Sequence, residues 1–131
     1  MRLWLFIGAV NGGVAVALGA LGAHLLDPAL GDHARATYDT AVRYHLVHSL
    51  ALIGVAVLAP HLPRGSGGGR LAAAGAAFTS GIVLFCGGLY ALALGVSWGA
   101  RVAPVGGMLL IAGWVLLAAT AFGMQDRHVR P

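Results

Sequence analysis

Four long stretches without charged residues constrain this chain more than any other feature. An α-helix rises about 1.5 Å per residue, so about 20 apolar residues cross a hydrocarbon core about 30 Å thick. Lipid offers no partners to backbone N–H and C=O groups, so each stretch should be helical. The sequence therefore predicts an all-α fold, an integral membrane bundle of four transmembrane helices. The uncharged stretches are Leu3–Ala23, Leu46–Leu62, Leu71–Val96 and Val102–Met124, and the second of them also carries His48 and His61.

Composition supports one membrane domain. Hydrophobic residues make up 59% of the chain and charged residues 9%, whereas a soluble domain has about 25% charged residues. The N-terminal apolar run is longer than the apolar region of a signal peptide, so we expect it to be retained. The four spans leave no room for a soluble domain, and we predict a single transmembrane domain over residues 1–131. The predicted spans are residues 3–26, 44–62, 71–96 and 102–124, with the second helix extended into the membrane interface.

The charges favour an orientation rather than a nucleic-acid partner. The net charge of +4 comes from eight Arg against four Asp. These arginines are scattered over loops and ends and form no basic stripe, so we expect no nucleic-acid binding. An excess of arginine marks the cytoplasmic side of a membrane protein. Five arginines against three therefore predict that both termini are cytoplasmic; the five are Arg2, Arg64, Arg70, Arg127 and Arg130, and the three are Arg35, Arg43 and Arg101.

The segments between the spans contain helix-breaking signals. Asp27-Pro28 predicts a break, because Pro disfavours helical geometry in the residue before it. A helix starting near His33 is expected to enter the membrane near Tyr44. The sequence RGSGGGR, residues 64–70, predicts a flexible hairpin link. Pro104 is placed in the first turn of the last helix, where its missing N–H costs little.

Small residues indicate where the helices pack. Glycine and alanine at spacings of four let helix backbones approach closely in a membrane. Asn11 lies near mid-membrane and is expected to make an interhelical hydrogen bond, since an unpaired amide is costly there. An alternative is that one of these small-residue faces binds another subunit. The predicted packing residues are Gly8, Asn11, Gly12, Gly19, Gly88, Gly106, Gly107 and Gly113.

Hairpin topology gathers polar residues at one end of the predicted bundle. The first and third helices end there, and the second and fourth begin there. Trp98 and Pro104 lie in this layer, and Tyr90 lies deeper. Any site is therefore expected here, and the candidate residues are His24, Arg43, Tyr44, His48, Tyr90 and Arg101.

Three histidines, His24, His45 and His48, are predicted at similar depth in this layer. His45 and His48 are three residues apart and should face roughly the same way. Imidazoles from two helices can ligate a metal or a b-type haem. A proton relay or a quinone site is another interpretation, and hydrogen bonding to backbone, carboxylates or water is the simplest. The single Cys86 forms no metal-binding spacing, and no nucleophile has a base at a recognisable spacing.

Four sequence blocks resemble the YgdD-like family of small bacterial inner-membrane proteins. That family is classed as a domain of unknown function and is similar to a small eukaryotic transmembrane protein. The order and spacing of the blocks carry the resemblance over nearly the whole chain. The blocks are GALGAHLL (residues 19–26), TAVRYHLVHSLALI (40–53), FCGGLYALAL (85–94) and APVGGMLLIAGWVLLA (103–118).

The resemblance implies a four-helix protein of the bacterial inner membrane and brings no established activity. In the family pattern, Gln is common at the position of His45, and this difference weakens a three-histidine site. Thr is common at the position of Ala103. The residues that match the family blocks are Gly22, Ala23, His24, Thr40, Ala41, Val42, Arg43, Tyr44, His48, Gly88, Tyr90, Pro104, Gly106, Gly107, Gly113 and Trp114.

These observations favour a non-enzymatic accessory or scaffold protein without a metal or cofactor. Its expected partners are membrane lipids and a larger membrane complex or further copies of itself. Arg43 and Arg101 are expected to pair with Asp27, Asp39 or lipid phosphates near the interface. The alternative is a small carrier, or a protein that binds a metal, haem or quinone through His24 and His48.

Overall fold

A computed structural model describes residues 2–26, 30–62 and 66–122. Every element in these ranges is helical, and two of the helices contain a π-helical segment. The first helix comprises α1 and η1, the second α2 and η2, the third α3, η3 and α4, and the fourth α5 alone. Their bounds are α1 Arg2–Leu21, η1 Gly22–Leu26, α2 Asp32–Leu58, η2 Ala59–His61, α3 Ser66–Gly81, η3 Ile82–Cys86, α4 Gly87–Ala93 and α5 Gly99–Phe122.

All four of these helices are long and apolar enough to cross a membrane. The spans are Arg2–Leu26, Asp32–His61, Gly67–Ala93 and Gly99–Phe122. The prediction of an all-α protein with four transmembrane helices is confirmed.

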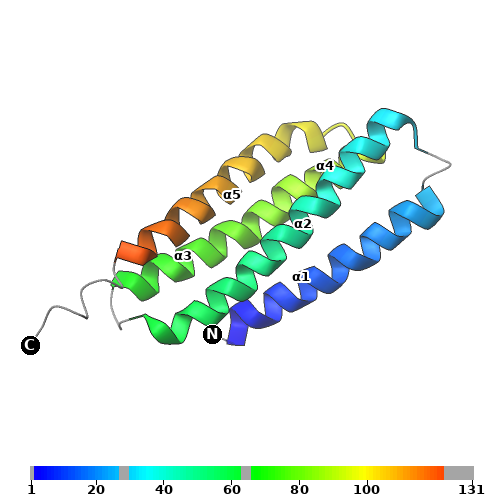
Figure 1. Cartoon of the computed structure of the whole chain (residues 1–131). Helices are drawn as coiled ribbons and strands as arrows, with labels where there is room; N and C mark the ends of the chain where they lie inside the picture. Colours follow the sequence, from blue (N-terminus) through cyan, green and yellow to red (C-terminus); the bar gives the residue numbers. More distant parts are fainter. Residues whose placement is uncertain (1, 27–29, 63–65, 123–131) are drawn as a thin grey trace, which may run out of the picture.

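The helices pack in chain order. Figure 1 shows α1 beside α2, α2 beside the α3–α4 helix, and that helix beside α5. In the most apolar stretch of the first helix, 11% of the residues are buried. In the corresponding stretch of the second helix, 44% are buried. The second and third helices therefore form the centre, and α1 and α5 flank them.

The apolar core lies between the two central helices and α5. Phe78, Leu52, Val55 and Cys86 are among the largest fully buried side chains. Leu110 of α5 belongs to the same cluster. Since lipid tails are as apolar as these side chains, close packing rather than water exclusion stabilises such contacts.

Glycines allow the closest backbone contacts. A Cβ atom added at Gly106 would overlap the backbone nitrogen of Phe85 and lie 2.7 Å from the carbonyl carbon of Leu84. One added at Gly8 would lie 3.0 Å from the carbonyl oxygen of Ser49. Gly19, Gly81, Gly88 and Gly113 also lie at tight helix contacts, and so do Gly22, Gly75 and Gly99, which were not among the predicted packing residues.

Gly12 and Gly107 are looser than the other predicted packing glycines. A Cβ at Gly12 would lie 3.8 Å from the Ser49 Cβ, and one at Gly107 would lie 3.4 Å from the Phe85 ring. Both distances are compatible with ordinary van der Waals contact. These two positions therefore leave room for a side chain.

The glycine-rich link is shorter than predicted. Helix α3 begins at Ser66, so Gly67–Arg70 is helical, and Arg64 and Gly65 lie outside the described residues. An internal glycine costs a helix up to about 1 kcal/mol. In a membrane, however, a helix is the way for a single segment to satisfy its own backbone groups, and Gly67 is buried.

The last two spans also begin and end differently from the prediction. Helix α4 ends at Ala93 rather than near Val96, because the chain leaves the helix at Leu94 and turns at Gly95, whose φ is 87°. That left-handed conformation is readily available only to glycine. Helix α5 begins at Gly99, so Pro104 lies inside the helix and not in its first turn.

Candidate functional site

His45 joins three helices through a buried hydrogen-bond network. Its Nε2 lies 3.1 Å from Asn11 Oδ1 on α1, and its Nδ1 lies 3.3 Å from the Tyr90 hydroxyl on α4. The Asn11 amide nitrogen donates to the Ile7 carbonyl at 2.8 Å. Because that carbonyl can only accept, Asn11 presents Oδ1 to His45, and His45 Nε2 must carry the donated hydrogen. In the neutral ring, Nδ1 then accepts from Tyr90. We call Asn11, His45 and Tyr90 the His45 network.

Further contacts close the space around this network. The Tyr38 hydroxyl donates to the Leu18 carbonyl on α1 at 2.7 Å. The Tyr38 and Tyr90 rings meet edge to face, with centroids 5.0 Å apart. The Ser49 hydroxyl donates to the His45 carbonyl at 2.7 Å. The His45 side of α2 is therefore covered by α1 and α4, and both ring nitrogens of His45 have partners.

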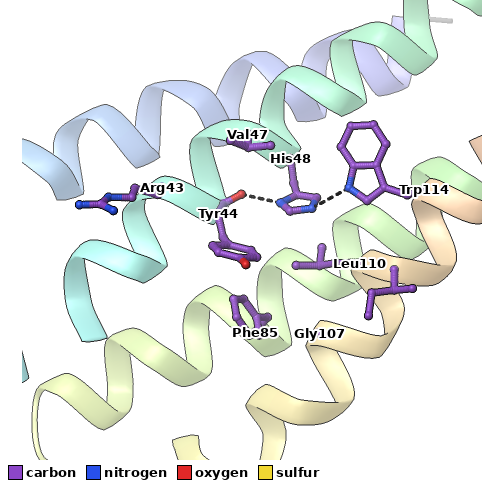
Figure 2. Close-up of a pocket in the computed structure, with 9 residues that line it drawn as sticks. Arg43, Tyr44, Val47, His48, Phe85, Gly107, Leu110 and Trp114 are labelled. Carbon is purple, nitrogen blue, oxygen red and sulfur yellow. Dashed lines mark hydrogen bonds between the residues drawn. The ribbon is translucent and has the colours of Figure 1, made fainter. Parts of the chain in front are cut away.

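His48 has its own complete set of hydrogen bonds on another side of α2. Its Nδ1 lies 2.7 Å from the Tyr44 carbonyl, and its Nε2 lies 3.1 Å from the Trp114 indole nitrogen on α5 (Figure 2). A carbonyl only accepts and an indole N–H only donates. His48 must therefore be neutral, with its hydrogen on Nδ1 and its Nε2 lone pair occupied by Trp114.

A groove lies beside His48, between α2 and α5. Its volume is about 540 Å³, within the range of ligand pockets. Aromatic rings form much of its wall: the Tyr44 ring stacks on His48 with centroids 5.8 Å apart and lies 4.9 Å from the Phe85 ring of η3. The lining residues are Arg43, Tyr44, Val47 and His48 of α2, Phe85 of η3, and Gly107, Leu110, Ile111 and Trp114 of α5 (Figure 2). We call this space the α2–α5 groove.

The structure brings together three of the six candidate site residues. Arg43, Tyr44 and His48 line the α2–α5 groove. Tyr90 belongs to the His45 network instead. Arg101 is exposed near the start of α5, and His24 is exposed in η1.

His24 is not at the depth of His48. A Cβ added at Gly22 would meet the Tyr38 ring, so the end of the first helix lies level with the start of α2. His48 is ten residues beyond Tyr38, which is about 15 Å along a helix. The two imidazoles therefore cannot share one ligand, and His45 and His48 face different helices.

No group of three His, Cys, Asp or Glu side chains that could hold a metal ion occurs within the described ranges. Imidazole binds a metal through a free ring nitrogen. Both nitrogens of His45 and both of His48 are engaged by protein groups. Within the described residues, the arrangement offers hydrogen bonding and an apolar groove rather than a ligand set.

The sequence prediction missed Phe85 as a groove residue and Trp114 as the partner of His48. Trp114 entered only as part of a family block. An indole N–H inside a membrane span requires an acceptor, so this residue carried a usable signal. Phe85 also entered only as part of a family block, and it lies in the π-helical segment η3.

Comparison with known proteins identifies relatives over almost the whole chain. Residues 18–107 match the family described as "Protein of unknown function (DUF423)". The UPF0382 membrane protein YwdK of Bacillus subtilis is 38% identical over 122 residues, which cover 92% of this chain and 97% of that protein. The UPF0382 inner membrane protein YgdD of Escherichia coli K12 is 34% identical over 133 residues, covering 98% of this chain and 95% of that protein.

A Staphylococcus aureus relative, the UPF0382 membrane protein SAB0533, is 34% identical and covers 93% of this chain and 97% of its own. No solved structure matches the chain. The resemblance found in the four sequence blocks is thereby confirmed. This chain belongs to the DUF423 family of membrane proteins, which includes YgdD.

Proposed function

We propose that this protein is a non-enzymatic accessory or scaffold subunit that acts through lateral helix contacts within the bilayer. The observation that carries the proposal is the outer face of α1. This helix lies at the edge of the molecule, and Gly8 and Ala15 are its buried residues.

Helix α1 has small residues on its outer face as well as on its inner face. Ala9, Gly13 and Ala17 follow one another at spacings of four and are exposed. A Cβ at Gly13 would meet no atom within 4 Å, whereas one at Gly8 would meet α2. Gly8 therefore serves packing within the chain, whereas Gly13 contacts no other helix among the described residues.

A stripe of this kind suits another helix better than lipid. Small residues at spacings of four allow backbones to approach, and the resulting dispersion contacts drive association between membrane helices. Lipid tails adapt to any apolar surface and gain nothing from such a stripe. The occupant is thus a transmembrane helix, from a second copy of this chain or from a larger complex.

Cross-linking in membranes tests this proposal. In a Cys86→Ala background, Gly13→Cys is expected to form a covalent adduct with a neighbouring subunit. The adjacent substitution Val14→Cys, about 100° around the helix, is the matched control and should react much less. The mass of the adduct distinguishes a second copy from another protein. Equal reaction at both positions, or none at Gly13→Cys, would contradict the proposal.

The alternative, a cofactor carrier using His24 and His48, has less support. It requires the two imidazoles at one ligand, and the packing of Gly22 beside Tyr38 argues against this. A colourless, metal-free protein is expected after purification in mild detergent.

A further inference from the structure

The α2–α5 groove combines an apolar interior with an arginine at its end. Val47, Leu110 and Ile111 supply aliphatic surface, and none of the lining residues is acidic. His48 and Trp114 satisfy each other. The interior can therefore take a hydrocarbon chain without leaving an imidazole or indole group unpaired.

Arg43 has no protein partner within the described residues. It makes no hydrogen bond or ion pair there, and the expected pairing with Asp39 is not formed. Asp27, the other acidic residue expected to pair with it, lies outside the described ranges. Among the described residues, no acidic side chain is in contact with the positive charge that Arg43 presents at the groove.

The position of Arg43 along α2 makes this charge unusual. The His48–Trp114 hydrogen bond aligns α2 with α5, and the two helices then begin at a similar level. Arg43 is eleven residues beyond Asp32 and Arg101 two residues beyond Gly99, so Arg43 lies about 13 Å deeper along the helix axis. Arg43 is also the last charged residue of α2, at the edge of its uncharged stretch.

The Arg43 side chain is directed to the near interface. Helical side chains lean toward the N-terminus of their helix, and Figure 2 shows Arg43 extending away from His48 toward the start of α2. The guanidinium group can thereby reach the headgroup level while its stem stays in the apolar layer. This places the positive charge above the apolar part of the groove.

We propose that the α2–α5 groove binds an anionic phospholipid, with its phosphate at Arg43 and an acyl chain along Phe85, Leu110 and Ile111. A guanidinium group binds phosphate oxygens in a bidentate manner, and the groove holds no acidic residue that would compete. Gly107 provides the depth, because a side chain there would occupy the groove beside Phe85. This site lies away from the outer face of α1 and does not depend on the proposed subunit contact.

Native mass spectrometry of the full chain in mild detergent tests this inference. The probes are phosphatidylglycerol and phosphatidylcholine with identical acyl chains, added in equal amounts. The wild type should retain about fivefold more of the anionic lipid, the factor expected for one arginine near an anionic headgroup. Arg43→Gln should abolish the preference, and Arg43→Lys should keep much of it because the charge remains.

Two controls make the test specific. Arg101→Gln removes an exposed arginine outside the groove and should leave the preference unchanged. Gly107→Leu should fill the groove and remove one bound lipid, whereas Gly87→Leu, at a position with no atom within 4 Å of a Cβ, should not.

Three results would overturn the inference: an unchanged preference in Arg43→Gln, an equal loss in Arg101→Gln, or a neutral amphiphile or a protein found in the groove. Arg43→Gln and Gly107→Leu change different parts of the site. A folding defect in one variant, detected by circular dichroism, therefore leaves the other decisive.

Discussion

Helix α2 carries two histidines three residues apart, and their surroundings differ. His45 is 5% exposed and His48 is 4% exposed, so burial does not separate them. The His45 side is closed by α1, whose Asn11 accepts a hydrogen bond from His45, and by α4, whose Tyr90 donates one. The His48 side faces α5 across a groove, and the hydrogen bond to Trp114 bridges it. Two equally buried rings thus have different surroundings: His45 lies at a junction of three helices, and His48 lies in the wall of an open groove.

The difference shows what determines the use of a polar residue in a membrane. At His45, three helices meet, and each ring nitrogen finds a partner on another helix. At His48, α2 faces α5 across the groove, and Phe85 of the π-helical segment η3 lines it. Such segments are frequent at functional sites. The neighbours of a polar residue, more than its burial, therefore decide whether it stabilises helix packing or lines a binding groove.

The largest expected effect on stability concerns the close contact between α5 and η3, beside the α2–α5 groove. Gly106→Ala would drive a Cβ into the backbone of Phe85 and Leu84, which cannot move aside like a side chain. We expect a loss of at least about 2–3 kcal/mol in the free energy of unfolding, measured by denaturation in detergent micelles. The neighbouring change Gly107→Ala should cost much less. Equal stability of the two variants would show that this helix contact is not as close as described.

The closed side should be sensitive to loss of its central ring. His45→Ala would leave Asn11 Oδ1 and the Tyr90 hydroxyl without a partner, at a cost of about 1–3 kcal/mol in the free energy of unfolding. His45→Gln keeps one donor and one acceptor and should stay closer to the wild type. The same denaturation experiment compares them. If His45→Gln were as damaging as His45→Ala, the hydrogen bonds would not be what stabilises this side.

The hydrogen bond between His48 and Trp114 should contribute less to stability than the His45 network. Trp114→Phe removes the indole donor to His48 Nε2 and retains an aromatic ring, so we expect a loss of about 1 kcal/mol. Nitrogen-15 NMR of the wild type should show a neutral His48 with its hydrogen on Nδ1. A spectrum with the hydrogen on Nε2 would contradict the assigned bonds to Tyr44 and Trp114.

The smallest effect separates hydrogen bonding from packing on the closed side. A double-mutant cycle with Asn11→Ala and His45→Ala should give a coupling energy of about 0.6 kcal/mol, the average for interhelical hydrogen bonds in a membrane protein. The four unfolding free energies of the cycle supply it. A coupling of zero would mean that Asn11 and His45 do not interact across α1 and α2.

Much of the fold could be predicted from the sequence, because four uncharged stretches admit few alternatives. Arg43, Tyr44 and His48 were expected near the start of the second span, and they line one groove in the middle of α2. The topology could not align one helix with its neighbour along the membrane normal, so His24 was expected at the depth of His48. Axial alignment depends on particular contacts, such as Gly22 against Tyr38, and an apolar stretch carries no information about them.

The sides of a helix were equally hard to predict. Residues three apart differ by about 60° around the helix axis, which is small in a sequence pattern. At a junction of four helices, that angle directs His45 to α1 and α4 and His48 to α5. The start of α3 at Ser66 was missed because glycine propensity favours a loop, whereas the membrane favours a helix.

Fluorescence quenching of Trp114 tests most directly whether the open side of α2 binds an anionic lipid. The variant with Trp4→Phe and Trp98→Phe leaves Trp114 as the single indole of the chain. Phosphatidylglycerol and phosphatidylcholine, each brominated on its acyl chains, are compared at equal mole fraction in otherwise identical vesicles. Stronger quenching by the brominated phosphatidylglycerol, lost in Arg43→Gln, is the predicted result. Equal quenching by the two lipids would contradict the account.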